Sequence, residues 1–196
     1  MAHDANFFNA YKMELSSGVV RDTHDEIFTD FGRLVGDDLN IVDLGCGSCE
    51  FHTYAKYEHN LYFGIDLHHI EPEMPVAQGT FNDVMTINLP FDPTGFVSLF
   101  STELKLSAKE RYKLYEAMFR KFPNLRAGMV SGIYHLGMEN EEMTLESHGI
   151  RDFQTNEHPR DVRSDVFQEY RTYRHVPSKL FGPNVIEVWK FLLRTI

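Results

Sequence analysis

The chain has 196 residues, of which 42% are hydrophobic and 13% aromatic. This length and composition are typical of one globular domain with a sizeable core, and they exclude general disorder and argue against two full domains. The 19 basic and 29 acidic residues give a net charge of −10. A negative field of this size repels phosphate backbones and anionic lipid headgroups, so nucleic acid is an unfavoured partner.

The number of cysteines and the lack of long apolar runs indicate in which cellular compartment the protein is found. The only cysteines are Cys46 and Cys49, which cannot form the framework of a secreted disulfide scaffold. Residues 1–18 contain no apolar stretch of signal-peptide length, and no run approaches the ~20 apolar residues that a membrane span requires. We therefore expect a cytoplasmic protein without membrane contact, built as a single domain over residues 1–196.

The first 36 residues are expected to be helical. Apolar side chains recur at helical spacing in residues 6–15 and again in residues 22–35, and Gly36 is placed to end the second helix. Residues 1–36 thus form an N-terminal helical segment, which can pack on the rest of the domain or serve as a partial lid.

Short apolar runs, typical of buried strands, alternate with helical patterns in the remainder. Strands are predicted at residues 39–44, 61–66 and 95–100, near Val76, and at 127–134, 169–176 and 185–193. Helices are predicted at residues 48–58 and 107–122, the latter with a capping box formed by Ser107 and Glu110. The pattern predicts an α/β protein: a doubly wound, mostly parallel seven-stranded sheet that ends in an antiparallel C-terminal hairpin.

In such sheets, ligands bind beyond the carboxyl ends of the central strands. Gly45 and Gly47 follow the first strand, where glycine permits a tight turn and lets a ligand touch bare backbone. Asp66 ends the second strand about twenty residues later, the interval at which an acid binds a ribose diol in nucleoside-binding folds. The alternative for Asp66 is a cap on the next helix.

Two further points along the chain fit the same ligand. Asn82 and Asp83 precede Leu89-Pro90-Phe91 and offer an amide and an acid to the amino edge of adenine, while Ser101 and Glu103 follow the fourth strand. Together with the first two strand ends, these residues are suited to surround one adenosine.

These motifs resemble those of the class I S-adenosylmethionine-dependent methyltransferases, over roughly residues 20 to 135. The sequence from Ile41 to Gly47 is similar to the first motif of that family, Gly64-Ile65-Asp66 to its ribose motif, and Asn82-Asp83 with Leu89-Pro90-Phe91 to its adenine motif. The resemblance implies a Rossmann-like fold and S-adenosyl-L-methionine as cofactor. It assigns cofactor binding to a set of residues: Tyr11, Asp43, Gly45, Cys46, Gly47, Asp66, Leu67, Asn82, Asp83 and Ser101.

Within that set, the resemblance gives different parts of the cofactor to different residues. The turn after the first strand approaches the methionine part, Asp66 holds the ribose, and either Asn82 or Asp83 meets the adenine. Tyr11 reaches the methionine carboxylate if the N-terminal helices form a lid.

The sequence also departs from the family. Cys49 stands where the third glycine of the first motif is usual, and Ser101-Thr102-Glu103-Leu104 replaces an Asp/Asn-Pro-Pro-Tyr motif after the fourth strand. The second departure argues against methylation of nucleic-acid or glutamine nitrogen of that kind. A dinucleotide-binding protein is disfavoured because Glu50 takes the position of its third glycine and would oppose a pyrophosphate.

We therefore expect methyl transfer to a small-molecule acceptor. If that acceptor must lose a proton, Glu103 and His135 are the candidate catalytic bases, and residues 136–180 are expected to form a substrate-side insertion. Attack on the aminocarboxypropyl arm of the cofactor, a non-catalytic adenosine-binding partner module and an RNA methyltransferase stay open as alternatives, as does the oligomeric state.

No metal site is expected. Cys46 and Cys49 have no second cysteine pair to complete a zinc site, and the ten histidines show no fixed helical pair. The two cysteines are better explained as small, semi-buried residues of the turn.

Overall fold

The computed structural model describes residues 19–36, 38–47, 49, 51–52, 61–67, 74–99, 106, 108–135, 164–175 and 185–196. Among these, the side chains of residues 19–25, 108, 133–135, 171–175 and 185–187 are not described. The predicted helix at 6–15 lies outside these ranges, and of the one predicted at 48–58 only residues 51 and 52 are seen as helical. No described helix is both long and apolar enough to cross a membrane.

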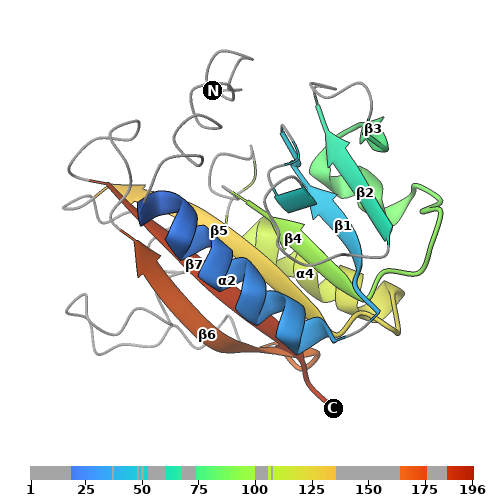
Figure 1. Ribbon diagram of the computed structural model, residues 1–196. Helices are drawn as coiled ribbons and strands as arrows, with labels where there is room; N and C mark the ends of the chain where they lie inside the picture. The colour runs from blue at the N-terminus through green and yellow to red at the C-terminus, as the bar shows by residue number, and fades with distance from the viewer. Residues whose placement is uncertain are drawn as a thin grey trace.

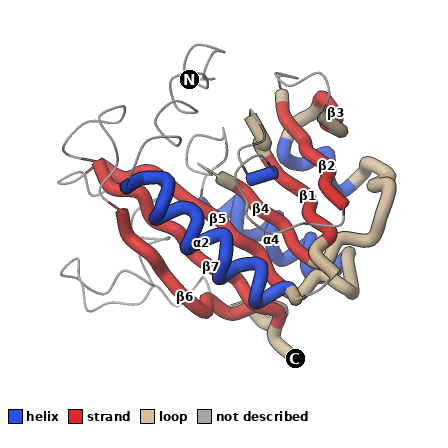
Figure 2. Tube along the Cα trace, in the orientation of Figure 1, coloured by secondary structure: helices blue, strands red, loops and turns tan. Residues whose placement is uncertain are grey.

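One seven-stranded sheet forms the centre of the protein (Figures 1 and 2). Its order is β3-β2-β1-β4-β5-β7-β6; β7 runs antiparallel to β5 and β6, and the other neighbouring pairs are parallel. The strands are β1 (Asn40–Leu44), β2 (Leu61–Asp66), β3 (Val76–Gln78), β4 (Gly95–Ser98), β5 (Ala127–His135), β6 (Phe167–His175) and β7 (Val185–Arg194). The predicted α/β class, the mostly parallel sheet and the antiparallel C-terminal hairpin are confirmed.

Helix α2 (Val19–Val35) covers one face of the sheet. Phe28 packs edge-on against Trp189 of β7, with 5.7 Å between ring centroids, and Phe31 lies 5.8 Å from Phe191. Gly36 ends the helix in the left-handed region, at φ 85°, as predicted. The described part of the N-terminal segment thus packs on the sheet, and a lid formed by residues 1–18 stays a prediction.

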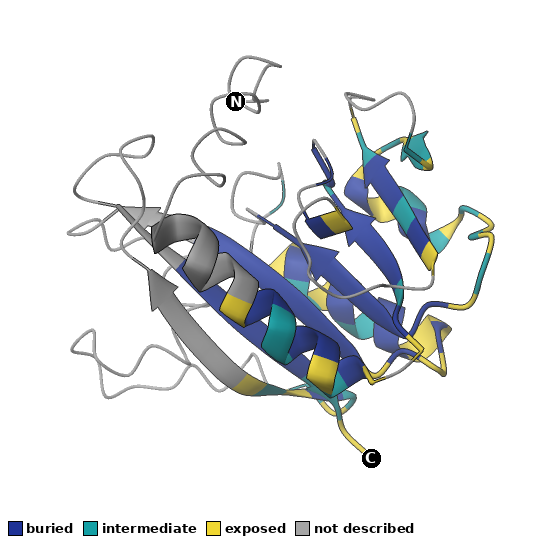
Figure 3. Cartoon of the chain, viewed as in Figure 1, coloured by how far each residue is buried: buried dark blue, intermediate teal, exposed yellow. Residues whose placement is uncertain are grey.

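Helix α4 (Ala108–Lys121) covers the opposite face, which makes the sheet doubly wound. Tyr115 stacks on Phe96 of β4 at 5.4 Å, and Phe119 lies 5.3 Å from Phe167 of β6. The central strands between the two helices are buried on both faces (Figure 3). This double burial explains why their sequences read as continuous apolar runs.

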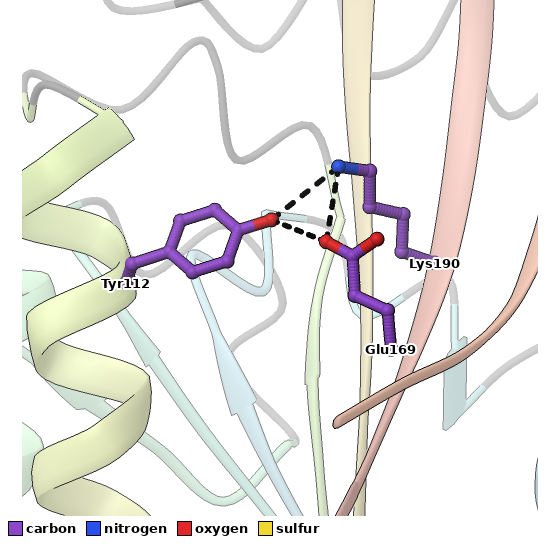
Figure 4. Close-up of polar contacts among 3 residues, drawn as sticks. All are labelled: Tyr112, Glu169 and Lys190. Atoms are coloured by element: carbon purple, nitrogen blue, oxygen red, sulfur yellow. Dashed lines mark hydrogen bonds and ion pairs between the residues drawn. The ribbon is translucent and has the colours of Figure 1, made fainter. Parts of the chain in front are cut away.

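A polar contact joins the C-terminal hairpin, β6 and β7, to α4 (Figure 4). The hydroxyl of Tyr112 donates to Glu169 Oε1 of β6 at 2.7 Å, and Lys190 of β7 approaches the same carboxylate. The C-terminal hairpin is therefore attached to the helix by charge as well as by apolar packing.

The strands end at different heights along the carboxyl edge of the sheet. Ser98, the last residue of β4, is paired with Val130 of β5, but β5 continues to His135. The five extra residues carry β5 about 16 Å beyond the end of β4 at ~3.3 Å per residue. β7 accompanies β5 along its whole length, so this antiparallel pair projects past the shorter parallel strands.

Candidate cofactor site

The turn after β1 has a backbone conformation that favours glycine. Gly45 has φ 68° and Gly47 has φ 51°, both in the left-handed region that residues other than glycine rarely adopt. Two such positions within three residues bend the chain sharply at the carboxyl edge of the sheet. The two glycines predicted to form a tight turn do so.

This turn is tied to the end of β2 by three hydrogen bonds. The amides of Gly45 and Cys46 donate to the carbonyl oxygen of Ile65 at 2.7 and 3.3 Å, and the amide of Gly47 donates to Asp66 Oδ2 at 2.8 Å. Asp66, predicted to hold a ribose, therefore also supports the turn. The carboxylate and the bare backbone of the turn lie side by side at the carboxyl ends of β1 and β2.

Asp43 places a second carboxylate below the turn. It is only 1% exposed, and its Oδ2 accepts a hydrogen bond of 2.7 Å from the hydroxyl of Tyr62. Asp43 and Tyr62 lie on the face of the sheet that α2 covers, because Tyr62 is in register with Ile41 and successive residues of a strand alternate between faces. Burial and the Asp43 charge raise the pKa of the Tyr62 hydroxyl well above its usual value, so it stays a donor.

Cys46 and Cys49 point into the core between the turn and α2, where both are buried. The Cys49 amide donates to the Cys46 carbonyl at 2.7 Å, and Cys49 adopts φ 58° at the position where the family has glycine. A hydrogen bond with Cys49, together with burial, raises the pKa of the Cys46 thiol far above its usual range. Any contact of Cys46 with a cofactor is thus left to its backbone.

A short 3-10 helix, η1 (Phe81–Met85), contains the residues predicted to meet adenine. Asp83 Oδ2 accepts from the amide and the hydroxyl of Thr80 at 2.6 and 2.8 Å, which caps the helix. Phe81 and Val84 anchor it in the core, whereas Asn82 is exposed. The sequence predicts that either Asn82 or Asp83 meets adenine. In the structure, Asp83 caps η1, whereas the side chain of Asn82 faces solvent.

Leu67 lies between these two regions. It follows Asp66 directly, its side chain is 46% exposed, and its carbonyl accepts from Gln78 Nε2 of β3 at 3.1 Å. A large apolar side chain held at the carboxyl edge in this way can pack on a planar ring.

The remaining predicted site residues are not placed by the structure. Tyr11, Ser101 and Glu103 lie outside the described residues, and for His135 only the backbone at the end of β5 is described. No group of three or more histidine, cysteine or acidic side chains suited to a metal occurs among the described residues. Of the predicted insertion at 136–180, residues 167–175 form the edge strand β6, and 136–163 lie outside the description.

Sequence reasoning missed Tyr62. A tyrosine in an apolar strand reads as core, and nothing in the sequence gives the register that sets it beside Asp43. The signal available in the sequence was the hydroxyl of a tyrosine in the predicted strand at 61–66. The preceding predicted strand, at 39–44, carries the Asp43 carboxylate within an apolar run.

No family model and no curated protein matches the sequence. Solved structures do match. Magnesium protoporphyrin IX methyltransferase (ChlM) from Synechocystis PCC 6803 aligns at 11% identity over 97% of this chain and 92% of its own, with a TM-score of 0.53. The N-methyltransferase NodS from Bradyrhizobium japonicum WM9 aligns at 11% identity over 97% and 100%, with a TM-score of 0.51, and the 23S rRNA methyltransferase ErmE at 13% identity over 88% and 68%, with a TM-score of 0.52.

At these identities the similarity defines the fold. The chain has the fold of the class I S-adenosylmethionine-dependent methyltransferases, as its motifs predict. Its glycine turn and Asp66 lie at the carboxyl edge of that fold, where open α/β sheets bind their ligands.

Proposed function

We propose that this protein binds S-adenosyl-L-methionine at the carboxyl ends of β1 and β2 and transfers its methyl group to a small-molecule acceptor. The observation that carries the proposal is the hydrogen bond of 2.8 Å between the Gly47 amide and Asp66 Oδ2. It joins the glycine turn and an acid suited to a ribose diol in one structural unit. Structures with the same fold were solved with S-adenosylmethionine or S-adenosylhomocysteine bound.

The residues present fit the chemistry of this cofactor. The methionine end carries an ammonium and a sulfonium cation, which the buried carboxylate of Asp43 below the turn complements. The ribose diol fits Asp66, and the exposed side chains of Leu67 and Asn82 offer the adenine an apolar surface and an amide, with Asp83 shaping η1. Tyr11 and Ser101 are proposed to complete the site.

Catalysis would rest on positioning. S-adenosyl-L-methionine supplies a methyl group made electrophilic by its sulfonium. The protein then has to hold donor and acceptor in line at about 3 Å and exclude water. For an acceptor that must lose a proton, Glu103 or His135 is proposed as the base.

The acceptor is proposed to be small because a net charge of −10 opposes the approach of a nucleic acid. The fold itself admits both kinds, since ChlM is named for a porphyrin and ErmE for ribosomal RNA. We also propose a cytoplasmic location, which suits two cysteines that are free thiols in contact with each other.

Isothermal titration calorimetry with S-adenosyl-L-methionine tests cofactor binding. We expect the wild type to bind and Asp66→Ala to bind at least tenfold more weakly, because a charged hydrogen-bond partner is worth about 1.5–3 kcal/mol. Asp92→Ala is the matched control: Asp92 is an exposed loop acid that contacts Asn124, and its loss should leave binding unchanged. Absence of binding by a folded wild type at millimolar ligand would overturn the proposal.

Product analysis tests the reaction. The protein is incubated with methyl-labelled S-adenosyl-L-methionine and a cell extract divided into small-molecule and RNA fractions. We expect S-adenosylhomocysteine and label in the small-molecule fraction. Label in RNA contradicts the proposed acceptor, and methylthioadenosine as the sole product contradicts methyl transfer.

A further inference from the structure

A chain of buried polar side chains runs below the glycine turn. The hydroxyl of Tyr62 lies 2.7 Å from Asp43 Oδ2, Cys49 is in hydrogen-bond contact with Tyr62, and Cys46 is in hydrogen-bond contact with Cys49. All four side chains are buried between the turn and α2. Apolar side chains would fill this space equally well, so the polarity of these four residues calls for an explanation.

The chemistry of Asp43 and Tyr62 fixes the direction of the hydrogen bond between them. An ionised carboxylate can only accept, so the Tyr62 hydroxyl donates its single proton to Asp43. Cys49 lies within hydrogen-bond reach of both the Tyr62 hydroxyl and the Cys46 thiol. The proton nearest the carboxylate therefore points toward Asp43.

This arrangement favours the charged form of Asp43. A buried carboxylate loses several kcal/mol of hydration, and directed hydrogen bonds offset that loss. The other titratable groups nearby are Asp66 at the end of β2 and His52, whose ring lies 4.9 Å from that of Tyr62. Burial lowers the pKa of His52 below its usual value, which favours its neutral form.

We infer that Tyr62 is a positioning residue of the cofactor site: its hydroxyl, with Cys49 behind it, holds the Asp43 carboxylate charged and oriented as the counter-charge for the ammonium group of the cofactor. The inference rests on the proposed function, because it takes S-adenosyl-L-methionine as the ligand. Tyr62 itself lies below the turn and acts through Asp43. It extends the site to a β2 residue that none of the sequence motifs includes.

A series of three ligands separates this role from a purely structural one. S-adenosyl-L-methionine and S-adenosylhomocysteine carry the ammonium group, whereas 5′-methylthioadenosine keeps the adenosine and lacks it. We expect Tyr62→Phe to bind the first two about tenfold more weakly than the wild type, since a hydrogen bond to a charged group is being removed. Its affinity for 5′-methylthioadenosine should change less than twofold.

Tyr112→Phe is the matched control. It also deletes a tyrosine hydroxyl that donates to a carboxylate over 2.7 Å, but its partner is Glu169, on the far side of the sheet. We expect this variant to bind all three ligands like the wild type. Circular dichroism and thermal unfolding establish that each variant is folded, and if Tyr62→Phe is not, Cys49→Ala tests the next link, with a loss of about threefold in the same pattern.

Two results would overturn the inference. One is a folded Tyr62→Phe protein with wild-type affinity for S-adenosyl-L-methionine, and the other is an equal loss of affinity for all three ligands. Failure of the wild type to bind any of the three would instead overturn the proposed function, so the two failures are distinguishable.

Discussion

Lys190 on β7 directs its ammonium group to Glu169 on β6, with 3.3 Å between Nζ and Oε1 (Figure 4). The lysine side chain is only 4% exposed and the glutamate side chain 23%. The hydroxyl of Tyr112 donates to the same carboxylate oxygen and accepts from Lys190 at 3.3 Å. A buried cation on the last strand thus depends on one partly buried acid and one hydroxyl from α4.

The first prediction follows from this dependence. Glu169→Gln leaves the Lys190 ammonium buried without its counter-charge, and we expect a loss of about 2 kcal/mol in the free energy of unfolding, reduced from the fully buried case because Glu169 is partly exposed. The double variant Glu169→Gln with Lys190→Met should recover most of the loss. Urea unfolding measures all three proteins.

The exposed ion pair between Arg120 and Asp165 supplies the control, since its side chains are 55% and 75% exposed. Asp165→Asn should change the free energy of unfolding by less than about 0.5 kcal/mol. Equal losses for Asp165→Asn and Glu169→Gln would show that burial of Lys190 has no energetic consequence.

The second prediction concerns the contact between Gly64 and Cys46. A Cβ atom at Gly64 would lie 2.6 Å from Cys46 Sγ, closer than real Cβ atoms approach, and 3.0 Å from Val76 Cγ2, which is tighter than most. We expect Gly64→Ala to lose about 2 kcal/mol of unfolding free energy, as overpacking of a core does. Because the sulfur is the main obstacle, adding Cys46→Ala should restore part of that loss, and additive losses in the double variant would contradict the interpretation.

The third prediction concerns thiol reactivity. Burial and the hydrogen bond with Cys49 raise the pKa of Cys46, so its thiolate is scarce at pH 8, where an ordinary cysteine reacts. Iodoacetamide at pH 8 should leave both cysteines of the native protein unmodified and should modify both in 6 M guanidinium chloride, as read by mass spectrometry. Rapid modification of the native protein would show that the turn opens or that the thiols face solvent.

Much of the fold was predictable because the central strands are buried on both faces. The strand predicted at 61–66 matches β2, and the strand predicted at 95–100 overlaps β4. Short continuous apolar runs bounded by glycines or acids are typical of strands that are buried on both faces. Helix α4 was predicted to within a residue at each end from its apolar stripe. Helix α2 begins at Val19, three residues before the predicted start.

The site was predictable only where chain order determines position. Gly45, Gly47 and Asp66 come together because parallel strands end at one edge, which the sequence pattern implies. The contact of Tyr62 with Asp43 depends on strand register, and the capping of η1 by Asp83 depends on a five-residue helix too short to show periodicity. Such contacts are set by tertiary structure and leave no periodic trace in the sequence.

Under the proposed function, the bond between the Gly47 amide and Asp66 gives one acid two duties, support of the turn and contact with the ribose. An exchange at position 66 that admitted a ribose phosphorylated at its 2′ oxygen would also deprive the amide of its acceptor and loosen the turn. Such an exchange therefore demands a compensating change elsewhere in the turn.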